Sequence, residues 1–373
     1  MIGKEERDAV IRVIESGVLS EYQGNWSDNF YGGTEIKALE SEWAEYFGVK
    51  HAIACNSATS GLWMACAAIG LQNQHDPLND CAEVIVTPYS MTCSASIPLH
   101  FGAKPVFADI EPDYFCLNPA SVESKITEWT KAIIVVDLFG QPYDADAINE
   151  IAERYGKKYG HKIYVIEDAA QAIGATYKGR YTGTLGDIGV YSLNRHKHIQ
   201  CGEGGVVVAN DDELAFKLRL AMNHSEAVIN SMVGGLIHND ESTPLKAFNE
   251  ASKSLVGMNL RMTELSAAVA REQLKKLDGI LKVYREYAKY FTVKVRPGCE
   301  HAYYRYAFNV YDFLINKKED NILSKPIFEH KNHYITPLYK MPLFRSLGYP
   351  NGLCPVCEEI ESKIVLAWLK EVP

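Results

Sequence analysis

The sequence has no apolar stretch long enough to span a lipid bilayer, no excess of basic residues, and no repeated or low-complexity segment. A membrane-spanning helix needs about 20 consecutive apolar residues. A nucleic-acid-binding surface needs clustered Lys and Arg, whereas this chain has a formal net charge of −9. The first residues, Met1-Ile-Gly-Lys-Glu-Glu-Arg, are charged and do not form an apolar signal segment. We therefore expect a cytoplasmic globular protein that binds neither nucleic acid nor a membrane, although a small anionic ligand is compatible with this charge.

The sequence also lacks the cysteine and histidine spacing of a metal site. Its nine cysteines are scattered and odd in number, which is typical of reduced thiols in a reducing compartment. The pair Cys354-Pro-Val-Cys357 would need a second pair or nearby histidines to bind zinc, and none follow before Pro373. We expect two ordinary thiols there and no metal.

Apolar strands alternate with helices along the first half of the chain. Near-continuous apolar strands separated by helices indicate an α/β fold with a mostly parallel sheet covered on both faces. After about residue 212 helices dominate, and a strand is expected over 302–314. We predict a large α/β domain over 1–244, including an N-terminal helical segment, and a smaller C-terminal α+β domain over 245–373. The expected strands of the large domain are 51–56, 82–87, 104–109, 131–137, 163–167, 189–192 and 204–209.

Small polar residues follow the first two strands, at the sheet edge where doubly wound folds bind ligands. Ala58, Thr59 and Ser60 come after strand 51–56 and open a helix. Free backbone N–H groups and two hydroxyls at a helix start can bind a phosphate, although an ordinary helix cap accounts for the same residues. Tyr89 and Met91 follow the next strand, in a position to cover one face of a flat ring.

An acid and a lysine carry the chemical argument. Asp168 ends the apolar run Ile163-Tyr-Val-Ile-Glu-Asp168, where a carboxylate is costly unless it is paired. Lys197 follows a strand ending at Ser192 and precedes a glycine-rich stretch. Taken singly, Asp168 fits a salt bridge or helix cap, and Lys197 fits a surface lysine or part of a phosphate-binding patch. Together they fit a pyridoxal phosphate enzyme, in which an acid keeps a proton on the pyridine nitrogen and a lysine carries the aldehyde as a Schiff base.

Further motifs follow one another along nearly the whole chain. They are Ser57-Ala-Thr-Ser60, Phe101-Gly-Ala-Lys-Pro-Val-Phe-Ala-Asp109, Leu138-Phe-Gly-Gln-Pro142, Glu167-Asp-Ala-Ala-Gln-Ala172, Gly202-Glu-Gly-Gly205 and Gly257-Met-Asn-Leu-Arg-Met-Thr-Glu264. In this order and spacing they resemble the motifs of the DegT/DnrJ/EryC1/StrS sugar aminotransferases, which are pyridoxal phosphate enzymes. The resemblance implies the aspartate aminotransferase fold (fold type I): a three-layer domain with a mostly parallel sheet, plus a smaller C-terminal α+β domain.

The resemblance also implies a role for each matched residue. Lys197 would form the Schiff base and move protons, and Asp168 would pair with the pyridine nitrogen. The remaining cofactor-binding residues would be Ala58, Thr59, Ser60, Met91, Gln171, Ser192 and, from the partner chain of a homodimer, Asn259. A branch of the family carries histidine in place of the lysine and acts as a sugar dehydratase. Counting five residues back from Gly202 gives Lys197, which favours transamination although His196 and His198 flank it.

The resemblance predicts the reaction better than the substrate. It implies that glutamate donates the amine and that a keto sugar accepts it, in the synthesis of a cell-surface polysaccharide or lipopolysaccharide. The chain most resembles the branch that aminates 8-oxo-3-deoxy-manno-octulosonate to its 8-amino derivative. The alternatives are a nucleotide-linked 4-keto or 3-keto sugar, a dehydratase that transfers no amine, and a non-catalytic cofactor-binding regulator. Candidates for the sugar's carboxylate are Arg195, His196 and His198.

Overall fold

The computed structural model describes residues 2–24, 27–71, 82–225, 255–309, 328–331, 336–361 and 363–369. These residues form two compact units, each assembled from two stretches of the chain. The first unit comprises His75–Gly189 and Leu277–Pro373, and the second comprises Ile2–Gln74 and Val190–Lys276. The predicted boundary at 244/245 lies outside the described residues, so the division into 1–244 and 245–373 stays a prediction.

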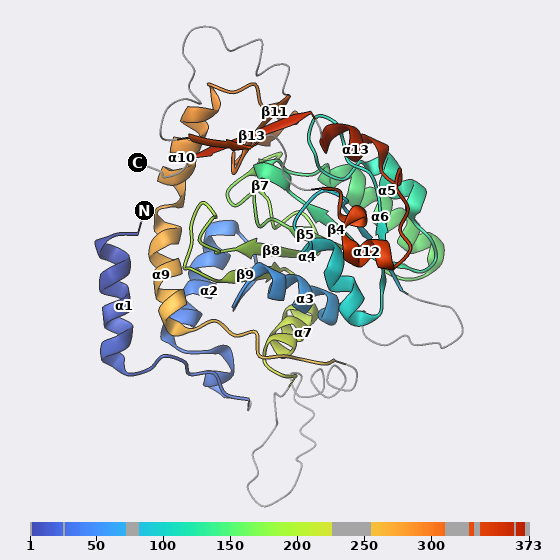
Figure 1. Ribbon diagram of the computed structural model, residues 1–373. Helices are drawn as coiled ribbons and strands as arrows, with labels where there is room; N and C mark the ends of the chain where they lie inside the picture. The colour runs from blue at the N-terminus through green and yellow to red at the C-terminus, as the bar shows by residue number, and fades with distance from the viewer. Residues whose placement is uncertain are drawn as a thin grey trace, which may run out of the picture. The chain divides into compact units, whose positions relative to one another are not determined.

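The first unit contains parallel strands in the order β5 (Tyr164–Asp168), β4 (Thr130–Val136), β2 (Glu83–Val86) and β3 (Lys104–Phe107). Strands β5 and β4 lie side by side in Figure 1. The side chains of β5, β4 and β2 are almost all buried, as near-continuous apolar strands require, whereas β3 at the edge has only Pro105 and Phe107 buried. The register pairs Val136 with Asp168, so the carboxyl ends of β4 and β5 lie side by side. The predicted mostly parallel sheet and α/β class are confirmed.

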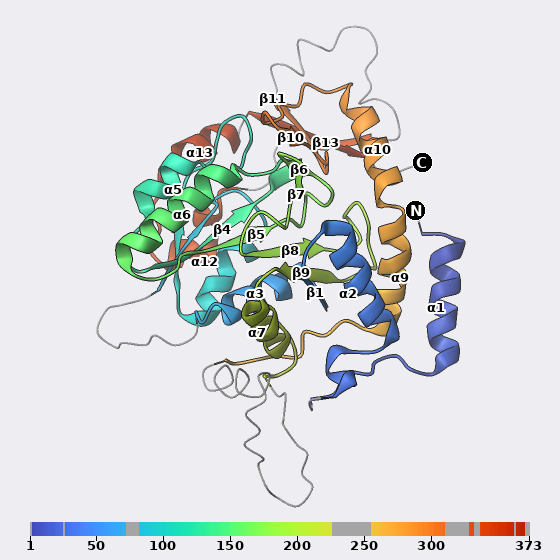
Figure 2. The same ribbon diagram turned by 180° about the vertical axis from the view of Figure 1, so that it is seen from behind.

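Two neighbouring helices, α5 (Pro119–Lys125) and α6 (Ala145–Tyr159), cover a hydrophobic core in this unit (Figure 2). Helix α6 begins where the Asp144 side chain accepts a hydrogen bond from the backbone N–H of Ala147, and it ends at Gly160 in the left-handed region. Its buried residues Ile148 and Ile151 pack with Val135 and Val165 from the strands. This core fixes the strands whose ends carry the acids described below.

The rest of the first unit is built from short elements. An antiparallel sheet has the order β11 (Tyr306–Asn309), β13 (Ile364–Leu369), β12 (Phe328–Lys331), and a smaller one has the order β10 (Cys299–Glu300), β6 (Thr176–Tyr177), β7 (Arg180–Tyr181). The helical elements are α4 (Cys93–Ser96), η2 (Ile97–Phe101), η3 (Leu138–Gly140), α10 (Leu277–Ala288), η5 (Leu338–Lys340), α12 (Pro342–Ser346) and α13 (Pro355–Glu361). The predicted strand 302–314 begins later, with β11, and its last residues, 310–314, lie outside the described residues.

The second unit is built around β1 (His51–Cys55), which pairs antiparallel with β9 (Gly205–Ala209). Strand β8 (Ile188–Ser192), which enters this unit at Val190, is the next strand beside β9. Helix α3 (Ala58–Ala68) packs so closely that a Cβ on Gly61 would lie 2.7 Å from Val190 Cγ1. Trp43 of α2 (Thr34–Phe47) contacts Tyr191, the next residue along β8, at 5.3 Å between ring centroids. Because successive strand residues point to opposite faces, α3 and α2 cover opposite faces of these strands.

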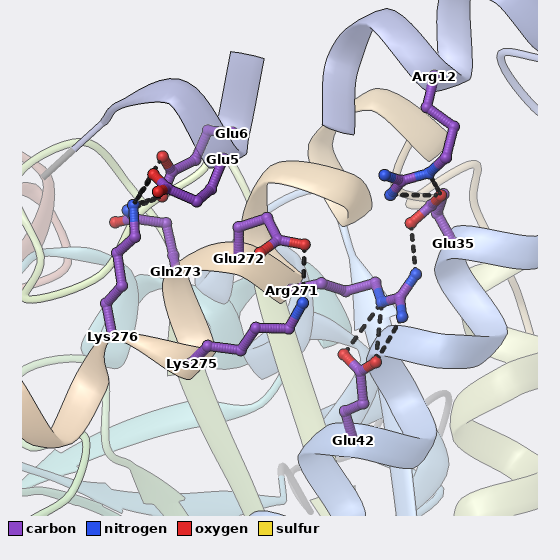
Figure 3. Close-up of polar contacts among 10 residues, drawn as sticks. All are labelled: Glu5, Glu6, Arg12, Glu35, Glu42, Arg271, Glu272, Gln273, Lys275 and Lys276. Carbon is purple, nitrogen blue, oxygen red and sulfur yellow. Dashed lines mark hydrogen bonds and ion pairs between the residues drawn. The ribbon is translucent and has the colours of Figure 1, made fainter. Parts of the chain in front are cut away.

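Helices α1 (Lys4–Ser16) and α9 (Glu264–Lys275) lie side by side in the second unit (Figures 1 and 2), and α9 also packs on α2. Arg271 of α9 bridges Glu35 and Glu42 of α2, at 2.7 Å and 2.5 Å, and Arg12 of α1 reaches Glu35 at 3.0 Å (Figure 3). Helix α7 (Asp212–Met222) packs on α3. No helix in the described part of the chain is both long and apolar enough to cross a membrane.

Candidate active site

Asp168, the predicted partner of the pyridine nitrogen, ends strand β5 in the first unit with only 4% of its surface exposed. Its Oδ2 accepts a hydrogen bond from the Ser94 hydroxyl at 3.0 Å, and its Oδ1 accepts one from the Ala170 backbone N–H at 3.2 Å. These donors offset part of the cost of burying a carboxylate and fix its orientation. Ser94 on α4 was not among the predicted site residues, because its contact joins segments 74 residues apart in the chain.

A second pair of acids lies next to Asp168. Glu167 is fully buried, and its oxygens accept hydrogen bonds from the backbone N–H groups of Gly183, Leu185 and Gly186 at 2.6, 2.8 and 3.1 Å. Asp137, also fully buried, directly follows β4, and its side chain accepts the backbone N–H of Tyr143 at 2.9 Å. Burial, and then the charge and hydrogen bond of Glu167, raise the pKa of Asp137 well above its ordinary value.

The hydrogen bonds decide which acid of this pair keeps the proton. Three backbone donors stabilise a negative charge on Glu167, whereas only one serves Asp137. Asp137 therefore stays protonated, and its O–H donates a hydrogen bond to the ionised Glu167. The strand ends beside Asp168 carry less negative charge than their three acids would suggest.

Gln171, the predicted contact to the ring's phenolic oxygen, is buried, and its Oε1 accepts the backbone N–H of Phe139 at 3.0 Å. Phe139 has φ 61°, a left-handed conformation that is unfavourable for a bulky residue and needs such support. Tyr89 is fully buried against Phe139, edge to face at 6.3 Å, whereas Met91 is 52% exposed. The predicted ring-covering role of Met91 or Tyr89 stays a prediction.

In the second unit, the start of α3 has the donors that a phosphate requires. The Ser57 hydroxyl caps the helix by accepting the Ser60 backbone N–H at 3.1 Å, and the Ser60 hydroxyl bonds Ser57 Oγ at 2.9 Å and Asn56 Oδ1 at 2.5 Å. The Ser60 hydroxyl is thus part of the cap. The backbone N–H groups of Ala58 and Thr59 lie in the first turn, where the helix supplies no acceptor and the dipole favours an anion.

Gly205 keeps open the space beside this helix start. A Cβ at Gly205 would lie 2.7 Å from the Ala58 backbone nitrogen and 2.7 Å from the Ser57 carbonyl carbon, closer than side chains approach. The first residue of β9 must therefore be glycine for the helix start to come this near the sheet. Open backbone donors, a hydroxyl-rich cap and a glycine at the point of closest approach fit a bound phosphate group.

Lys197 lies in a closed loop between β8 and β9. The loop is closed at its base by hydrogen bonds from the Leu193 N–H to the Gly204 carbonyl at 2.8 Å and from the Cys201 N–H to the Leu193 carbonyl at 2.9 Å. The Lys197 N–H bonds the Asn194 carbonyl at 2.8 Å, so the lysine backbone is part of a tight turn. The lysine side chain is half-buried. The loop thus has the fixed backbone that a covalent anchor requires.

The other predicted residues near Lys197 in the sequence differ in solvent exposure. Ser192 is buried at the end of β8, where its Oγ accepts the Asn194 N–H at 3.3 Å. Arg195 and His196 are exposed and contact each other at 3.3 Å, and His198 is buried. The predicted contact of Arg195, His196 and His198 with a substrate stays a prediction.

Asn259, the residue predicted to reach a partner chain, is exposed. Its Oδ1 accepts Arg261 Nε at 2.9 Å, and its backbone forms an isolated bridge with Asn223. An exposed amide held by its own neighbour is compatible with the predicted contact to a second copy.

The predicted site residues therefore fall into two sets. The first unit holds Asp168, Gln171 and Met91. The second unit holds Ala58, Thr59, Ser60, Ser192, Arg195, His196, Lys197, His198 and Asn259. Each set includes one of the two groups that the chemistry requires: a buried acid in the first, and a lysine with a phosphate-binding helix start in the second.

Comparison with known proteins agrees with this chemistry. The sequence profile of the DegT/DnrJ/EryC1/StrS aminotransferase family matches residues 2–370. The chain is 33% identical to the spore coat polysaccharide biosynthesis protein SpsC of Bacillus subtilis, with 95% of this chain and 87% of that protein covered. It is 32% identical to GDP-perosamine synthase of Caulobacter vibrioides, with 89% and 83% covered.

Solved structures show the same fold. The crystal structure of S. venezuelae DesV in complex with a ketimine intermediate superposes with a TM-score of 0.75 at 26% identity, covering 97% of this chain and 88% of that one. The match with a fold type I aminotransferase confirms the predicted fold class. The chain belongs to the DegT/DnrJ/EryC1/StrS aminotransferase family and is a sugar aminotransferase that depends on pyridoxal phosphate.

Proposed function

We propose that this protein transfers the amino group of glutamate to a keto sugar in the cytoplasm, for a cell-surface polysaccharide, with Lys197 as its covalent anchor and proton carrier. The observation behind the proposal is that the chain contains both groups that this chemistry requires: a buried, hydrogen-bonded Asp168 and a lysine in a closed loop. The polysaccharide role is supported by the similarity to SpsC, whose name places it in spore coat polysaccharide synthesis.

Each residue has a distinct task in this proposal. Bound pyridoxal phosphate supplies an aldehyde that condenses with amines and a protonated ring that withdraws electrons. Asp168 keeps the proton on the ring nitrogen, because Ser94 and Ala170 already hold its carboxylate as an acceptor. Ala58, Thr59 and Ser192 would hold the phosphate. Lys197 would be the covalent anchor for the aldehyde, and its Nζ, when free, would serve as the general base and acid that moves a proton.

The resting state can be tested without knowing the acceptor. Purified protein is reduced with borohydride after incubation with pyridoxal phosphate and digested, and the modified lysine is located by mass spectrometry. We expect modification of Lys197, and a change in visible absorbance when glutamate is added, with release of 2-oxoglutarate. Lys197→Ala should lose both signals, whereas Lys217→Ala, which removes a lysine paired with Glu213 on α7, should keep them. Modification of another lysine, or an active Lys197→Ala variant, would refute the assignment.

Two acceptors are proposed, and a product assay separates them. One is 8-oxo-3-deoxy-manno-octulosonate, which would become its 8-amino derivative in lipopolysaccharide synthesis. The other is a nucleotide-linked 4-keto or 3-keto sugar, and the similarity to GDP-perosamine synthase, whose product name contains a nucleoside diphosphate, favours it. Each is incubated with the enzyme and glutamate, and the amino sugar is detected by mass spectrometry. Loss of water from the sugar with no 2-oxoglutarate formed would instead show a dehydratase.

The working unit is proposed to be a homodimer in which Asn259 reaches the partner's cofactor. Mixing the Lys197→Ala and Asn259→Ala variants tests this. A hybrid dimer contains one site with both residues intact, so the mixture should recover up to about a quarter of wild-type activity although each variant alone is impaired. No recovery after subunit exchange would place Asn259 in its own chain's site.

A further inference from the structure

The N-terminal helix is connected to the Lys197 loop by a chain of hydrogen bonds through α9. Its central residue is Glu6 on α1, which is 1% exposed. Glu6 accepts hydrogen bonds from Gln273 Nε2 at 2.7 Å and from Lys276 Nζ at 2.6 and 2.8 Å (Figure 3). The Gly3 backbone N–H is a third donor, at 2.7 Å. A buried carboxylate with three donors is a rigid acceptor, because each donor fixes it from a different direction.

The charge on Glu6 is maintained by these contacts. Burial alone would raise its pKa, but the hydrogen bonds from Lys276 and Gln273 outweigh burial and lower the pKa of Glu6 to about 2. Glu6 is therefore ionised at any pH at which the enzyme is folded and working. An ionised carboxylate has no proton to donate, so it can only accept from Gln273.

This one-way hydrogen bond determines how the Gln273 amide is oriented. Nε2 must face Glu6, which leaves Oε1 on the opposite side, where it accepts the backbone N–H of Gln200 at 3.2 Å. Gln273 is itself 1% exposed, so its amide is held by contacts within the protein. The Gln200 side chain accepts the Gly202 N–H at 2.9 Å, which ties the contact into the turn of the loop.

Gln200 lies three residues after Lys197, and Ile199 between them is fully buried. The base of the loop is already closed by the hydrogen bonds of Leu193, and Gln273 adds a support at the side that follows the lysine. Because a proton carrier loses efficiency when it is displaced by a fraction of an ångström, such a support affects the rate without touching the reacting atoms.

We propose that Gln273, oriented by Glu6 of the N-terminal helix, is a positioning residue that holds the backbone of the Lys197 loop for catalysis. The proposal rests on the role of Lys197 given above. It assigns a catalytic consequence to α1, which also packs against α9 and pairs with α2 through Arg12 and Glu35.

The test exchanges the two partners. Gln273→Glu places a second carboxylate against Glu6 and breaks the oriented contact. Glu6→Gln/Gln273→Glu restores it with donor and acceptor reversed, since Gln at position 6 donates to the new carboxylate, whose other oxygen accepts the Gln200 N–H. Lys275→Gln is the matched control, because Lys275 is the neighbouring α9 residue, is exposed, and pairs only locally with Glu272.

Two readouts separate positioning from general destabilisation. The first is hydrogen–deuterium exchange of the peptide containing Gln200 in the cofactor-free protein, and the second is kcat with glutamate as donor. For Gln273→Glu we expect exchange about tenfold faster and kcat about tenfold lower, with the KM for glutamate unchanged, because one buried hydrogen bond is lost. The double variant and Lys275→Gln should return to within about twofold of the wild type. The melting temperature is recorded for each protein.

The outcomes are decisive in either direction. Recovery of exchange and kcat in the double variant supports the proposal. Faster exchange with normal kcat, or a folded double variant that recovers neither, overturns it. The exchange experiment needs no cofactor, so it stands even if borohydride labelling shows that Lys197 is not the anchor. A labelled Lys197 with no effect of Gln273→Glu would instead refute this proposal alone.

Discussion

The proton shared by Asp137 and Glu167 leads to a prediction about the pH dependence of stability. Asp137 is neutral in the folded protein, because burial and the Glu167 carboxylate raise its pKa above the ordinary value of 3.8. In the unfolded chain it ionises above that value. Unfolding therefore releases one proton from Asp137 between the two pKa values, so this group's contribution to stability is complete below about pH 3.8 and declines as the pH rises toward the folded pKa.

The magnitude follows from the number of protons released. One proton lost on unfolding lowers the free energy of unfolding by about 1.4 kcal/mol for each pH unit. Asp137→Asn replaces the neutral acid with a neutral amide of the same shape, whose Nδ2 donates to Glu167 and whose Oδ1 accepts the Tyr143 N–H. The variant does not titrate at this position. Its stability relative to the wild type should therefore rise with pH above about 3.8, by about 1.4 kcal/mol for each pH unit over which Asp137 stays protonated in the folded protein.

The assay is urea unfolding of the cofactor-free proteins at several pH values, with the difference between variant and wild type plotted against pH. Other titrating groups cancel in this difference. Glu167→Gln is the informative contrast, because an amide cannot accept all three backbone N–H groups, so it should be destabilised at every pH by about 3 kcal/mol. If the difference between Asp137→Asn and the wild type is constant across these pH values, Asp137 is ionised in the fold and the assignment of the proton is wrong.

Three further changes test contacts of the predicted site residues and of the N-terminal helix. Ser94→Ala removes a buried donor to Asp168 and should weaken cofactor binding by about tenfold, measured by titration of visible absorbance, with Ser96→Ala as a control on the same short helix. Gly205→Ala forces a methyl group against the Ala58 nitrogen. Retention of pyridoxal phosphate by the protein on dialysis should therefore fall sharply. Unchanged retention would mean that the helix start does not bind the phosphate. The pKa of Glu6 is lowered from 4.5 to about 2 in the folded protein, so its ionisation stabilises the fold by at most about 3 kcal/mol. This contribution is present above pH 4.5 and is lost as the pH falls toward 2. Glu6→Gln should abolish that pH dependence in acid unfolding experiments.

The positions of Asp168 and Lys197 could be predicted from the sequence because each lies where local pattern is informative, whereas their roles stay predictions. Asp168 and the preceding Glu167 follow an apolar run, and such a run predicts a buried parallel strand with its carboxyl end at a binding edge. Lys197 lies between a strand and a glycine-rich stretch, which predicts a tight loop. The position of a residue within a few positions of a strand end is determined by that strand.

The remaining features depend on contacts that local pattern does not encode. The Glu6 to Gln273 hydrogen bond joins residues 267 positions apart, and neither residue type signals burial. The antiparallel pairing of β1 with β9 was not visible either, because both strands, apart from His51 at the start of β1, are made of apolar residues and glycine, as buried parallel strands are. The hairpin of β6 and β7 was missed because two-residue strands have no periodicity to detect.

Three of the buried acids in the described residues share one physical role, which is to accept backbone N–H groups. Glu167 accepts N–H groups of segment 183–186, Asp168 accepts that of Ala170, and Glu264 of α9 accepts those of Gly33 and Glu35 at 3.0 and 2.7 Å. In each case a carboxylate satisfies backbone donors of a segment that lacks regular partners. Glu6 acts on a loop in the same way, through the Gln273 amide. A carboxylate can only accept hydrogen bonds, so each supported segment can bind it only through its N–H groups. An amide or a hydroxyl in its place could also donate a hydrogen bond, which would permit a second arrangement of the segment.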